Sequence, residues 1–421
     1  MSAHAEINIE TKPRQFEASG HVARSLLKEI PVLSPQHSNS HVHGLLHGLS
    51  SDAVCLPVVE NGRPLGLINR NVFTTGMARP FAHDLFAKKT CHTFMNAEPI
   101  VVNQHTSIEE LSHKMVGSGR SNLNDGFIIT DDDGKYMGVG TGEDLIKLVV
   151  ELQAEKNRVI MDSIHYASTI QRSFLRPSDE DMASVLNDYF MHWEPRDKVG
   201  GDYYFCEKFE DGFFLALIDC TGHGVPGAFM TLIVASFLGH ILREHDRRDP
   251  ATLLAVMNKK LKVALRQLKK HEWEMDGGIE GEGQSDDGMD TAFCWIEPEK
   301  MTYAGAKTPI FFMDEGAAEV QSIEGDRKGV GYIETPMNNT WTNREIELPK
   351  GRCIYLTTDG VIDQIGQDKR IAFGKRRLSN LIQQNHDKSM PEQRDAILQA
   401  FYSWQGSQRR RDDVCFFGFR A

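Results

Sequence analysis

The sequence predicts a multi-domain α/β protein. With 421 residues the chain is too long for one ordinary hydrophobic core, so two or three domains are expected. Within residues 21–148, runs rich in β-forming residues alternate twice with helical segments, and from about residue 180 the pattern becomes strands, two apolar helices and more strands. A long helical stretch without proline or internal glycine separates the two regions. The expected order is therefore an N-terminal α/β module, a connecting helix and a larger C-terminal domain.

Composition excludes several classes of protein. The net charge of −12 and the lack of a long basic stripe argue against nucleic-acid binding. The seven cysteines form no CxxC pair, which favours buried thiols in a reducing compartment. Residues 1–20 are polar and acidic, unlike a signal peptide, and are expected to be a disordered tail. The apolar run 228–242 is too short to span a bilayer and predicts a core helix, so we expect a cytoplasmic protein without a membrane anchor.

The N-terminal module contains two similar units. The first includes "VCLPVVENGRPLGLINRNVF" (54–73), which predicts a strand, an Asn-Gly turn, a second strand and a helix start. The second includes "DGFIITDDDGKYMGVGTGEDLIKLV" (125–149), with the same order around an Asp/Gly turn. Before it, "EPIVVNQHTSIEELSHKM" (98–115) predicts a short strand and a capped helix.

This repeated order resembles a tandem pair of CBS (cystathionine beta-synthase-like) domains over residues 21–148. Such pairs stack by their sheets and often hold an adenine nucleotide, with a Gly-x-x-Thr/Ser-x-x-Asp pattern at the phosphate and ribose. The second unit carries this pattern at Gly138, Thr141 and Asp144. The resemblance therefore implies a nucleotide site at these residues.

The first unit departs from this pattern, because Gly66 is followed by Asn69 and Val72. At most one complete nucleotide site is expected. Two other interpretations stay open: Thr141 caps the following helix while the acid three residues later favours its N-terminal dipole, and the module serves only dimerisation or protein sensing.

Residues 142–175 predict one long helix, which Pro177 is expected to end. Steps of four and three give a heptad seam with two polar interruptions. The seam consists of Leu145, Val149, Leu152, Lys156, Val159, Ser163, Tyr166 and Ile170. Over the linker, residues 149–177, this pattern favours a two-stranded coiled coil and hence a homodimer; a single helix packed on its own domain is the alternative.

In the C-terminal region, 178–421, carboxylates repeatedly stand at the ends of apolar strands, beside glycine or another acid. They occur in "DKVGGDYYFCEKF" (197–209), "ALIDCTGHGVPGAFMT" (216–231), "GRCIYLTTDGVID" (351–363) and "RRRDDVCFFGFR" (409–420). Each alone is typical of a turn or a cap. If the strand ends converge, however, the carboxylates repel one another unless cations neutralise them, and oxygen ligands suit Mg²⁺ or Mn²⁺.

The order "VGGDYY", "DCTGHGVPGAFMT", "TTDGVID", "RRDDVCFF" resembles the PPM family of metal-dependent Ser/Thr protein phosphatases, in the branch of SpoIIE and RsbU. "IQRSFLRP" (170–177) matches the entry helix of that branch. The resemblance covers about residues 178–421. It implies an α-β-β-α sandwich, with two antiparallel sheets flanked by helices.

The resemblance also implies roles for individual residues. Two Mn²⁺ or Mg²⁺ ions would be held by Asp202, by Asp219 as the bridge, by the carbonyl of Cys220, and by Asp359 and Asp412. Supporting positions are Gly201, Gly222, His223, Gly224, Gly360 and Asp413, of which His223 is expected to form a hydrogen bond rather than to bind metal. The glycines at 222 and 224 permit a sharp turn where a Cβ would clash.

Two further assignments are less specific. Phosphate binding is assigned to Arg196 or Lys198, although their spacing is not the one familiar from relatives. The Gly-rich acidic segment 271–290 predicts a mobile loop. Near its end Asp287 or Asp290 could lie at a third, weaker metal, or serve the loop and the strand start.

The function implied is hydrolysis of phosphoserine or phosphothreonine by a metal-activated water, without a covalent phospho-enzyme. By resemblance the substrate is a STAS-type anti-sigma antagonist or a similar partner-switching protein, and the CBS module regulates activity through the linker helix. Two alternatives are a catalytically silent, phosphatase-like interaction protein and an adenine-nucleotide sensor.

Overall fold

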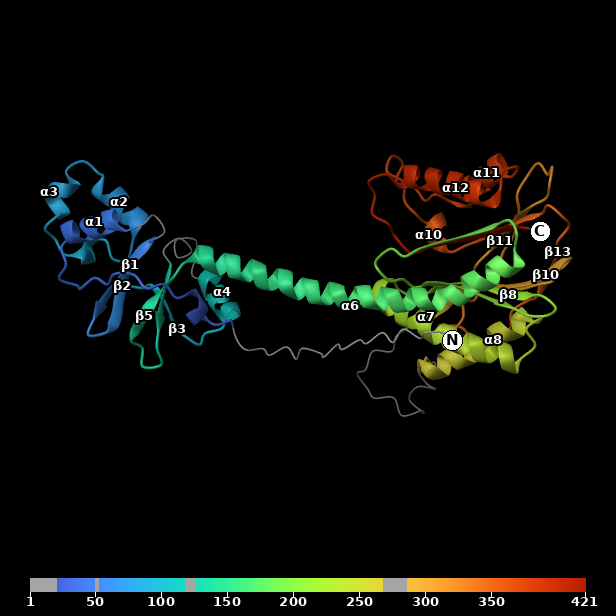
Figure 1. Cartoon of the computed structure of the whole chain (residues 1–421), viewed down its shortest axis with the longest axis horizontal. Coiled ribbons are helices and arrows are strands. Elements are labelled where there is room, and N and C mark those ends of the chain that lie inside the picture. Colours follow the sequence, from blue (N-terminus) through green and yellow to red (C-terminus); the bar gives the residue numbers. More distant parts are fainter. Residues whose placement is uncertain (1–20, 50–52, 118–125, 268–285) are drawn as a thin grey trace, which may run out of the picture. The chain divides into compact units, whose positions relative to one another are not determined.

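The computed structural model describes residues 21–49, 53–117, 126–267 and 286–421. The chain divides into two compact units, Met1–Val159 and Ile160–Ala421 (Figure 1). The expected tail, residues 1–20, and most of the Gly-rich segment, residues 271–285, lie outside the described residues. The last two residues of that segment, 289 and 290, begin strand β9 (Met289–Ile296) and are not part of a loop.

The N-terminal unit contains the repeat expected from the sequence. The first copy comprises α1 (Asn39–Gly48), β1 (Cys55–Glu60), β2 (Arg63–Asn69) and α2 (Arg70–Met77), followed by α3 (Ala82–Phe86). The second comprises β3 (Ile100–Asn103), α4 (Ile108–Gly117), β4 (Phe127–Thr130), β5 (Tyr136–Gly140) and the start of α6. Short 3-10 turns, η1 (Ala23–Leu26) and η2 (Cys91–Thr93), complete the unit.

Strand pairing makes the two copies equivalent. β3 runs parallel to β4, which pairs antiparallel with β5. In the first copy β1 and β2 form the antiparallel hairpin, and a single parallel bridge between Leu33 and Val58 stands in place of the preceding strand. The hairpin turns at Asn61 and Gly62 with φ of 52° and 79°, the left-handed conformation that Asn-Gly turns adopt.

Each copy has a small hydrophobic core, and a third cluster joins them. This cluster contains Cys55 and Leu67 from the first hairpin with Ile128 and Val139 from the second sheet. The two copies therefore pack through their strands, as the resemblance to a tandem CBS pair implies.

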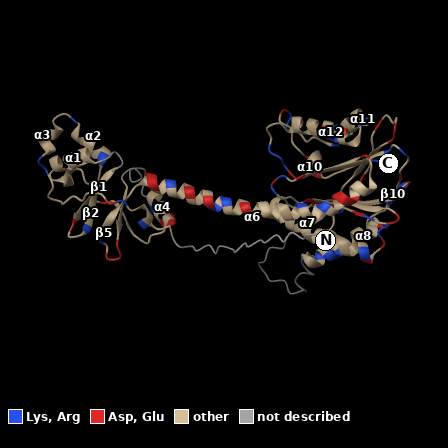
Figure 2. Cartoon of the chain, in the orientation of Figure 1, with Lys and Arg blue, Asp and Glu red and all other residues tan. Residues whose placement is uncertain are grey.

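Helix α6 (Gly142–Val185) is 44 residues long and continues past Pro177, so the expectation that this proline ends the helix is wrong. Leu175 and Met182 lie on either side of the proline and are both buried in the core of the C-terminal unit. Ser178 also accepts a 3.0 Å hydrogen bond from the backbone of Cys206 in β7. These contacts outweigh the one lost helical hydrogen bond. Figure 2 shows mixed charges along the first part of α6, as on a solvated helix.

The C-terminal unit is built around two five-stranded antiparallel sheets. The first has the order β13-β10-β9-β8-β7 and the second β12-β11-β14-β15-β6. Their bounds are β6 (Tyr189–Glu194), β7 (Asp202–Lys208), β8 (Phe213–Cys220), β9 (Met289–Ile296), β10 (Lys300–Ala306), β11 (Ile310–Met313), β12 (Gln321–Ile323), β13 (Arg344–Glu347), β14 (Cys353–Thr357) and β15 (Val414–Arg420).

Helices cover the outer faces of both sheets. α7 (Gly224–Glu244) and α8 (Pro250–Ala264) pack on the first sheet, and α12 (Met390–Gln405), next to α11 (Lys375–Asn385), packs on the second (Figure 1). The short α10 (Asp359–Ile362) follows β14. One large core fills the space between the sheets and under α7 and α8, and a second lies under α11 and α12. This is the expected α-β-β-α sandwich.

By length and composition, one helix in the described part of the chain, α7, is apolar enough to cross a membrane. Here it packs against β7, β8 and α8 as a core helix.

Candidate metal centre

Neighbouring strands of the first sheet place three aspartates side by side. Asp202, the first residue of β7, is the cross-strand partner of Asp219 near the end of β8. Asp219 is in turn the partner of Asp290 in β9. Directly opposed like charges destabilise a sheet unless they are neutralised. One end of this sheet is therefore a concentrated negative site.

Two more carboxylates lie at the ends of neighbouring strands in the second sheet. Asp359 begins α10 directly after β14, and Asp412 lies just before β15, the neighbour of β14. Gly360 permits this approach, because a Cβ there would lie 1.8 Å from the carbonyl oxygen of Asp413. Only glycine fits at this position, so the chain can turn tightly beneath the two acids.

The electrostatics show that the acids from both sheets share one site. Burial raises the pKa of Asp202 well above its usual value, and the charges of Asp413, Asp412 and Asp359 add to the shift. The pKa of Asp219 is likewise raised well above normal, by burial and then by Asp202, Asp359 and Asp412. The pKa of Asp359 is raised to about 6 by desolvation and then by Asp412, although the residue as a whole is exposed at the rim.

The donor set fits hard divalent cations. Carboxylate oxygens are the ligands that Mg²⁺ and Mn²⁺ prefer, and such ions keep several waters while binding one or two carboxylates. Within residues 21–49, 53–117, 126–267 and 286–421, no three His, Cys, Asp or Glu side chains stand close enough together to hold a metal ion as they are. If three or more of the carboxylates bind one ion, their side chains must therefore rotate toward it.

The backbone next to the acids is rich in glycine. A Cβ on Gly201 would lie 2.4 Å from the carbonyl oxygen of Gly222 and 2.8 Å from that of Cys220. Gly222 and Gly224 have φ of +83° and +65°, which side-chain-bearing residues rarely adopt. The expected Cβ clash is wrong at Gly222, where the nearest atom would lie 4.0 Å away, so it is the backbone conformation that requires glycine there. The carbonyl of Cys220 thus lies beside the Gly201 turn, next to Asp202 and Asp219.

Asp413 supports the loop in front of β7. Its side chain is buried, and its two oxygens accept 2.6 Å hydrogen bonds from the backbone N–H groups of Arg196 and Gly201. The guanidinium of Arg196 donates to the carbonyl of Arg411 at 3.0 Å. Asp413 therefore ties the β6–β7 loop to the segment that carries Asp412.

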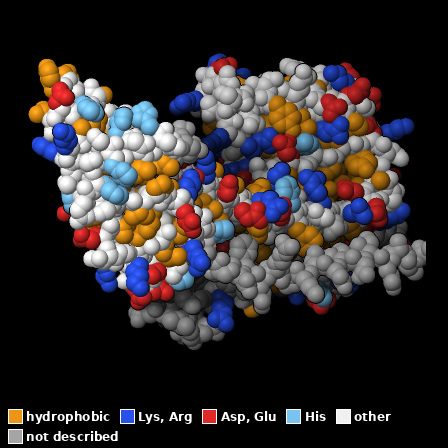
Figure 3. All heavy atoms as spheres, turned by 60° about the vertical axis from the view of Figure 1, so that its left-hand side comes forward, with side chains coloured by type: hydrophobic (Ala, Val, Ile, Leu, Met, Phe, Trp, Pro, Cys, Tyr) orange, Lys and Arg blue, Asp and Glu red, His pale blue; other side chains and the backbone are white. Residues whose placement is uncertain are grey.

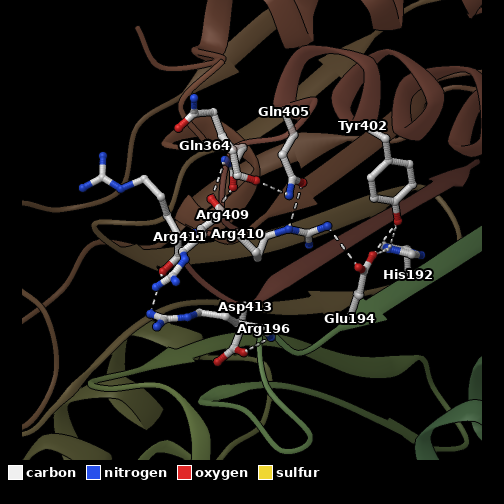
Figure 4. A network of polar contacts seen from close by, with 11 residues as sticks. His192, Glu194, Arg196, Gln364, Tyr402, Gln405, Arg409, Arg410, Arg411 and Asp413 are labelled. Carbon is white, nitrogen blue, oxygen red and sulfur yellow. Dashed lines mark hydrogen bonds and ion pairs between the residues drawn. The ribbon is translucent and has the colours of Figure 1, made fainter. Parts of the chain in front are cut away.

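The same segment is held on its other side by a polar network (Figure 4). The Arg410 guanidinium contacts Glu194 at 3.0 Å and Gln405 at 3.1 Å. His192 and Tyr402 also hydrogen-bond Glu194, whose pKa falls to about 2, chiefly through His192. These contacts fix the chain immediately before Asp412.

The remaining predicted residues take varied places. His223 forms a 3.1 Å contact through Nδ1 with Asp197, a hydrogen bond to a neighbouring acid. Lys198 lies in the same exposed loop as Arg196. Asp290 belongs to the acid cluster and is ion-paired with Lys307 at 3.2 Å, whereas the backbone carbonyl of Asp287 accepts from Gln267.

Two residues that sequence reasoning did not single out contact the centre. The Thr358 hydroxyl donates a 2.7 Å hydrogen bond to Asp202. Gln171 of α6 is buried, and its amide bonds both the carbonyl and the N–H of Gly200, at 2.8 and 3.2 Å. Thr358 lies within "TTDG", and its position next to Asp359 could have identified it from the sequence. No sequence motif marks Gln171.

In the N-terminal unit, the predicted nucleotide residues are occupied by internal contacts. The Thr141 hydroxyl bonds the Asp144 carboxylate and accepts from the Asp144 N–H at 3.2 Å, which caps the start of α6. Lys28 forms a 2.5 Å ion pair with Asp144. A Cβ on Gly138 would lie 2.8 Å from Leu27 and from the Lys28 carbonyl. These contacts favour the helix-cap interpretation.

If Thr141 is a cap, Thr141→Ala should destabilise the N-terminal unit by about 1 kcal/mol. Denaturant unfolding followed by circular dichroism measures this loss, with Thr169→Ala on the exposed part of α6 as a control expected to cost less. Equal effects of the two changes would contradict the capping role.

Histidines gather on the surface of the N-terminal unit (Figure 3). The rings of His43 and His47, one turn apart on α1, lie 4.6 Å from centroid to centroid. In the portion that the structure describes, no third His, Cys, Asp or Glu lies close enough to these two histidines to complete a metal site. Both are exposed surface residues.

The raised aspartate pKa values predict an unusual pH dependence. The folded, metal-free protein retains protons on Asp359 between pH 3.8, the usual aspartate value, and about 6, where the unfolded chain has lost them. Its stability should therefore fall as pH rises through this window. In EDTA, we expect a higher Tm at pH 5 than at pH 7.5, and a larger Mn²⁺-induced rise at pH 7.5.

Thermal scans at the two pH values check this, with Asp202→Asn as the variant expected to flatten the dependence. Glu194 acts in the opposite direction only below about pH 4.5, outside the measured range. A Tm that rises from pH 5 to pH 7.5 in EDTA would contradict the clustering of charged acids.

Comparison with solved structures defines the class as a PP2C-type phosphatase fold. The SiaA-PP2C domain of Pseudomonas aeruginosa is 30% identical, with a TM-score of 0.54, and the match covers 64% of this chain and 98% of that one. The phosphatase domain and regulatory fragment of SpoIIE from Bacillus subtilis is 14% identical over 55% of this chain and 62% of that one, with a TM-score of 0.41. The search of curated proteins found no match.

Family models give the finer assignment. The model for stage II sporulation protein E (SpoIIE) matches residues 210–421, and the CBS domain model matches residues 91–151. The chain belongs to the SpoIIE family. It is homologous to PP2C serine/threonine phosphatases, which are hydrolases of bacterial signalling, and carries a CBS domain on its N-terminal side.

Proposed function

We propose that the chain hydrolyses phosphoserine or phosphothreonine on a protein, with two Mn²⁺ or Mg²⁺ ions held by Asp202, Asp219, Asp359 and Asp412. The observation that carries this proposal is the convergence of carboxylates from both sheets on one site: Asp202 and Asp219 are cross-strand partners, and Thr358, next to Asp359, hydrogen-bonds Asp202. Burial first, and then the charges of the neighbouring acids, raise the pKa of Asp202, Asp219 and Asp359. A charge concentration of this kind is stable at neutral pH when cations neutralise it.

The residues around the acids support hydrolysis of a phosphate ester. Bound ions would supply an activated water and would offset charge on the phosphoryl group. Asp219, the cross-strand partner of both Asp202 and Asp290, would contact both ions, and the Cys220 carbonyl would supply a further oxygen. Arg196 and Lys198, on the exposed loop that Asp413 fixes, add positive charge for the substrate phosphate.

We further propose that the substrate is a phosphorylated STAS-type anti-sigma antagonist or a similar partner-switching protein in the cytoplasm. Membership of the SpoIIE family, with its role in bacterial signalling, supports this class of substrate. The exposed approach to Asp359 suits a phosphorylated residue presented by a folded partner.

Regulation is proposed to pass from the CBS module through α6 in a homodimer. Leu145 of the predicted heptad seam is buried in the core of the N-terminal unit and Leu152 packs against that core, but Val149, Tyr166 and Ile170 of the seam stay exposed. Covering them with the same helix of a second copy would remove apolar surface from water. An adenine nucleotide is the alternative input; at Asp144 it would have to displace Lys28.

Phosphate release from a phosphorylated STAS protein tests the proposal. We expect turnover with Mn²⁺, none in EDTA, and recovery when Mn²⁺ is restored. Calorimetric titration with Mn²⁺ provides an independent measurement. A folded protein that binds no Mn²⁺ would instead favour the catalytically silent interaction protein.

A further inference from the structure

Lys307 stands in an unusual backbone conformation beside the acid cluster. It directly follows β10 and has a φ of +61°, in the left-handed region that costs free energy for a residue with a side chain. Its N–H donates a 2.8 Å hydrogen bond to the Asp326 carbonyl, which holds it in this conformation. Strained residues that the surrounding structure holds in place concentrate at functional sites.

The strained backbone places the Lys307 ammonium on an acid. Its Nζ lies 3.2 Å from Asp290 Oδ1 and 4.5 Å from the centroid of the Tyr332 ring. Tyr332 in turn accepts a 3.4 Å hydrogen bond from the Thr221 hydroxyl, two residues after Asp219. The aromatic face and the carboxylate both attract a cation, so the ammonium has a defined position.

Asp290 belongs electrically to the proposed metal centre. It is the cross-strand partner of Asp219, and its charge contributes to the raised pKa of Asp219 and of Asp359. Burial raises the pKa of Asp290, and Lys307, by its charge and a hydrogen bond, and Tyr332, by a hydrogen bond, offset part of this rise. The Lys307 ammonium therefore partly neutralises the Asp290 carboxylate, as a bound metal ion would.

We propose that the Lys307 ammonium is an internal cation of the carboxylate cluster and takes, at Asp290, the place of a third metal ion. The inference rests on the proposed two-metal function. Lys307 acts through Asp290 and is a positioning residue. Its charge would repel a divalent ion brought to the same oxygen, so the wild-type centre is limited to two ions.

The number of Mn²⁺ ions bound per chain tests this inference. Lys307→Gly removes the ammonium and also suits the left-handed backbone, so this variant is expected to fold at least as well as the wild type. Mn²⁺ titrations to millimolar concentration, followed by electron paramagnetic resonance of the free ion and by calorimetry, should give two ions for the wild type and three for Lys307→Gly. Circular dichroism and Tm in EDTA establish that the variant is folded.

Matched variants sharpen the result. Lys307→Arg keeps the positive charge and should bind two ions. The double variant Lys307→Gly/Asp290→Asn removes the acid as well and should again bind two Mn²⁺ ions per chain. Lys300→Met changes a lysine at the other end of β10, ion-paired with Glu297 at 3.4 Å, and should leave the number at two.

Two ions in folded Lys307→Gly would overturn the inference and leave the phosphatase proposal intact. Three ions in Lys307→Arg would overturn it as well, because the positive charge would then not be the cause. A wild type that binds no Mn²⁺ at all would instead refute the proposed function on which it rests.

Discussion

Replacing Asp219 by asparagine should abolish Mn²⁺-dependent phosphate release and at the same time leave the metal-free protein as stable as the wild type or more so. Asp219 faces Asp202 across the hairpin and is the proposed bridge between two ions. Mutation of a residue that only orients a metal ligand typically lowers metal affinity or activity by about 10- to 100-fold. Loss of a ligand itself should therefore lower activity by more than about 100-fold. Asparagine keeps the shape but cannot supply the charge.

The gain in metal-free stability has a separate cause. The pKa of Asp219 is raised because burial and three or more nearby acids oppose its charge. Removing that charge relieves the repulsion, so Tm in EDTA at pH 7.5 should be unchanged or higher. The Tm rise on addition of Mn²⁺ should shrink. An ordinary destabilising substitution would lower Tm in both conditions.

Asp211→Asn is the matched control. Asp211 lies in the turn at the opposite end of the same β7–β8 hairpin and pairs with Arg247 and Arg248. The change should leave phosphate release and the Mn²⁺ response intact. If Asp219→Asn keeps wild-type turnover, or if the Asp211 variant loses it, the catalytic assignment is wrong.

The parts of this molecule that local sequence patterns encode could be predicted. The Asn-Gly and Asp/Gly turns define the hairpins of the CBS repeat, because those residues adopt left-handed backbone at low cost. Asp359 was recognisable because it ends an apolar strand and precedes glycine. The close approach of Gly360 to Asp413 shows why glycine is needed there.

Features that depend on tertiary contacts could not be predicted. Pro177 indicates a helix end when only local hydrogen bonds are considered, but Leu175 and Met182 are buried on either side of it. Lys307 belongs to no motif, and its role depends on Asp290, which lies in another strand. Lys28 and Asp144 are 116 positions apart in the sequence. Their ion pair engages the carboxylate that the CBS sequence pattern predicts to bind a nucleotide.

Gln171 is the strongest case of this kind, and Gln171→Leu should weaken Mn²⁺ binding by about 10- to 100-fold, the range measured for residues that orient metal ligands. The Gln171 amide is the direct connection between α6 and the turn that precedes Asp202: it accepts from the Gly200 N–H, donates to the Gly200 carbonyl, and contacts Thr231 of α7 at 3.1 Å. Leucine has a similar size and fills the same space, but leaves these buried backbone groups without partners.

Calorimetry gives the Mn²⁺ dissociation constant of the Gln171 variant, and phosphate release at saturating Mn²⁺ gives its turnover. Because Gln171 positions the turn and does not touch the proposed ions, high Mn²⁺ should restore most of the activity. Ser173→Ala, two residues further along α6 on its exposed face, is the control and should behave as the wild type. A Gln171 variant with normal Mn²⁺ affinity would show that the helix does not control the metal site. If affinity falls as expected, the hydrogen bonds between Gln171 and Gly200 couple α6 to the aspartates, since Gly200 and Asp202 are separated by a single residue.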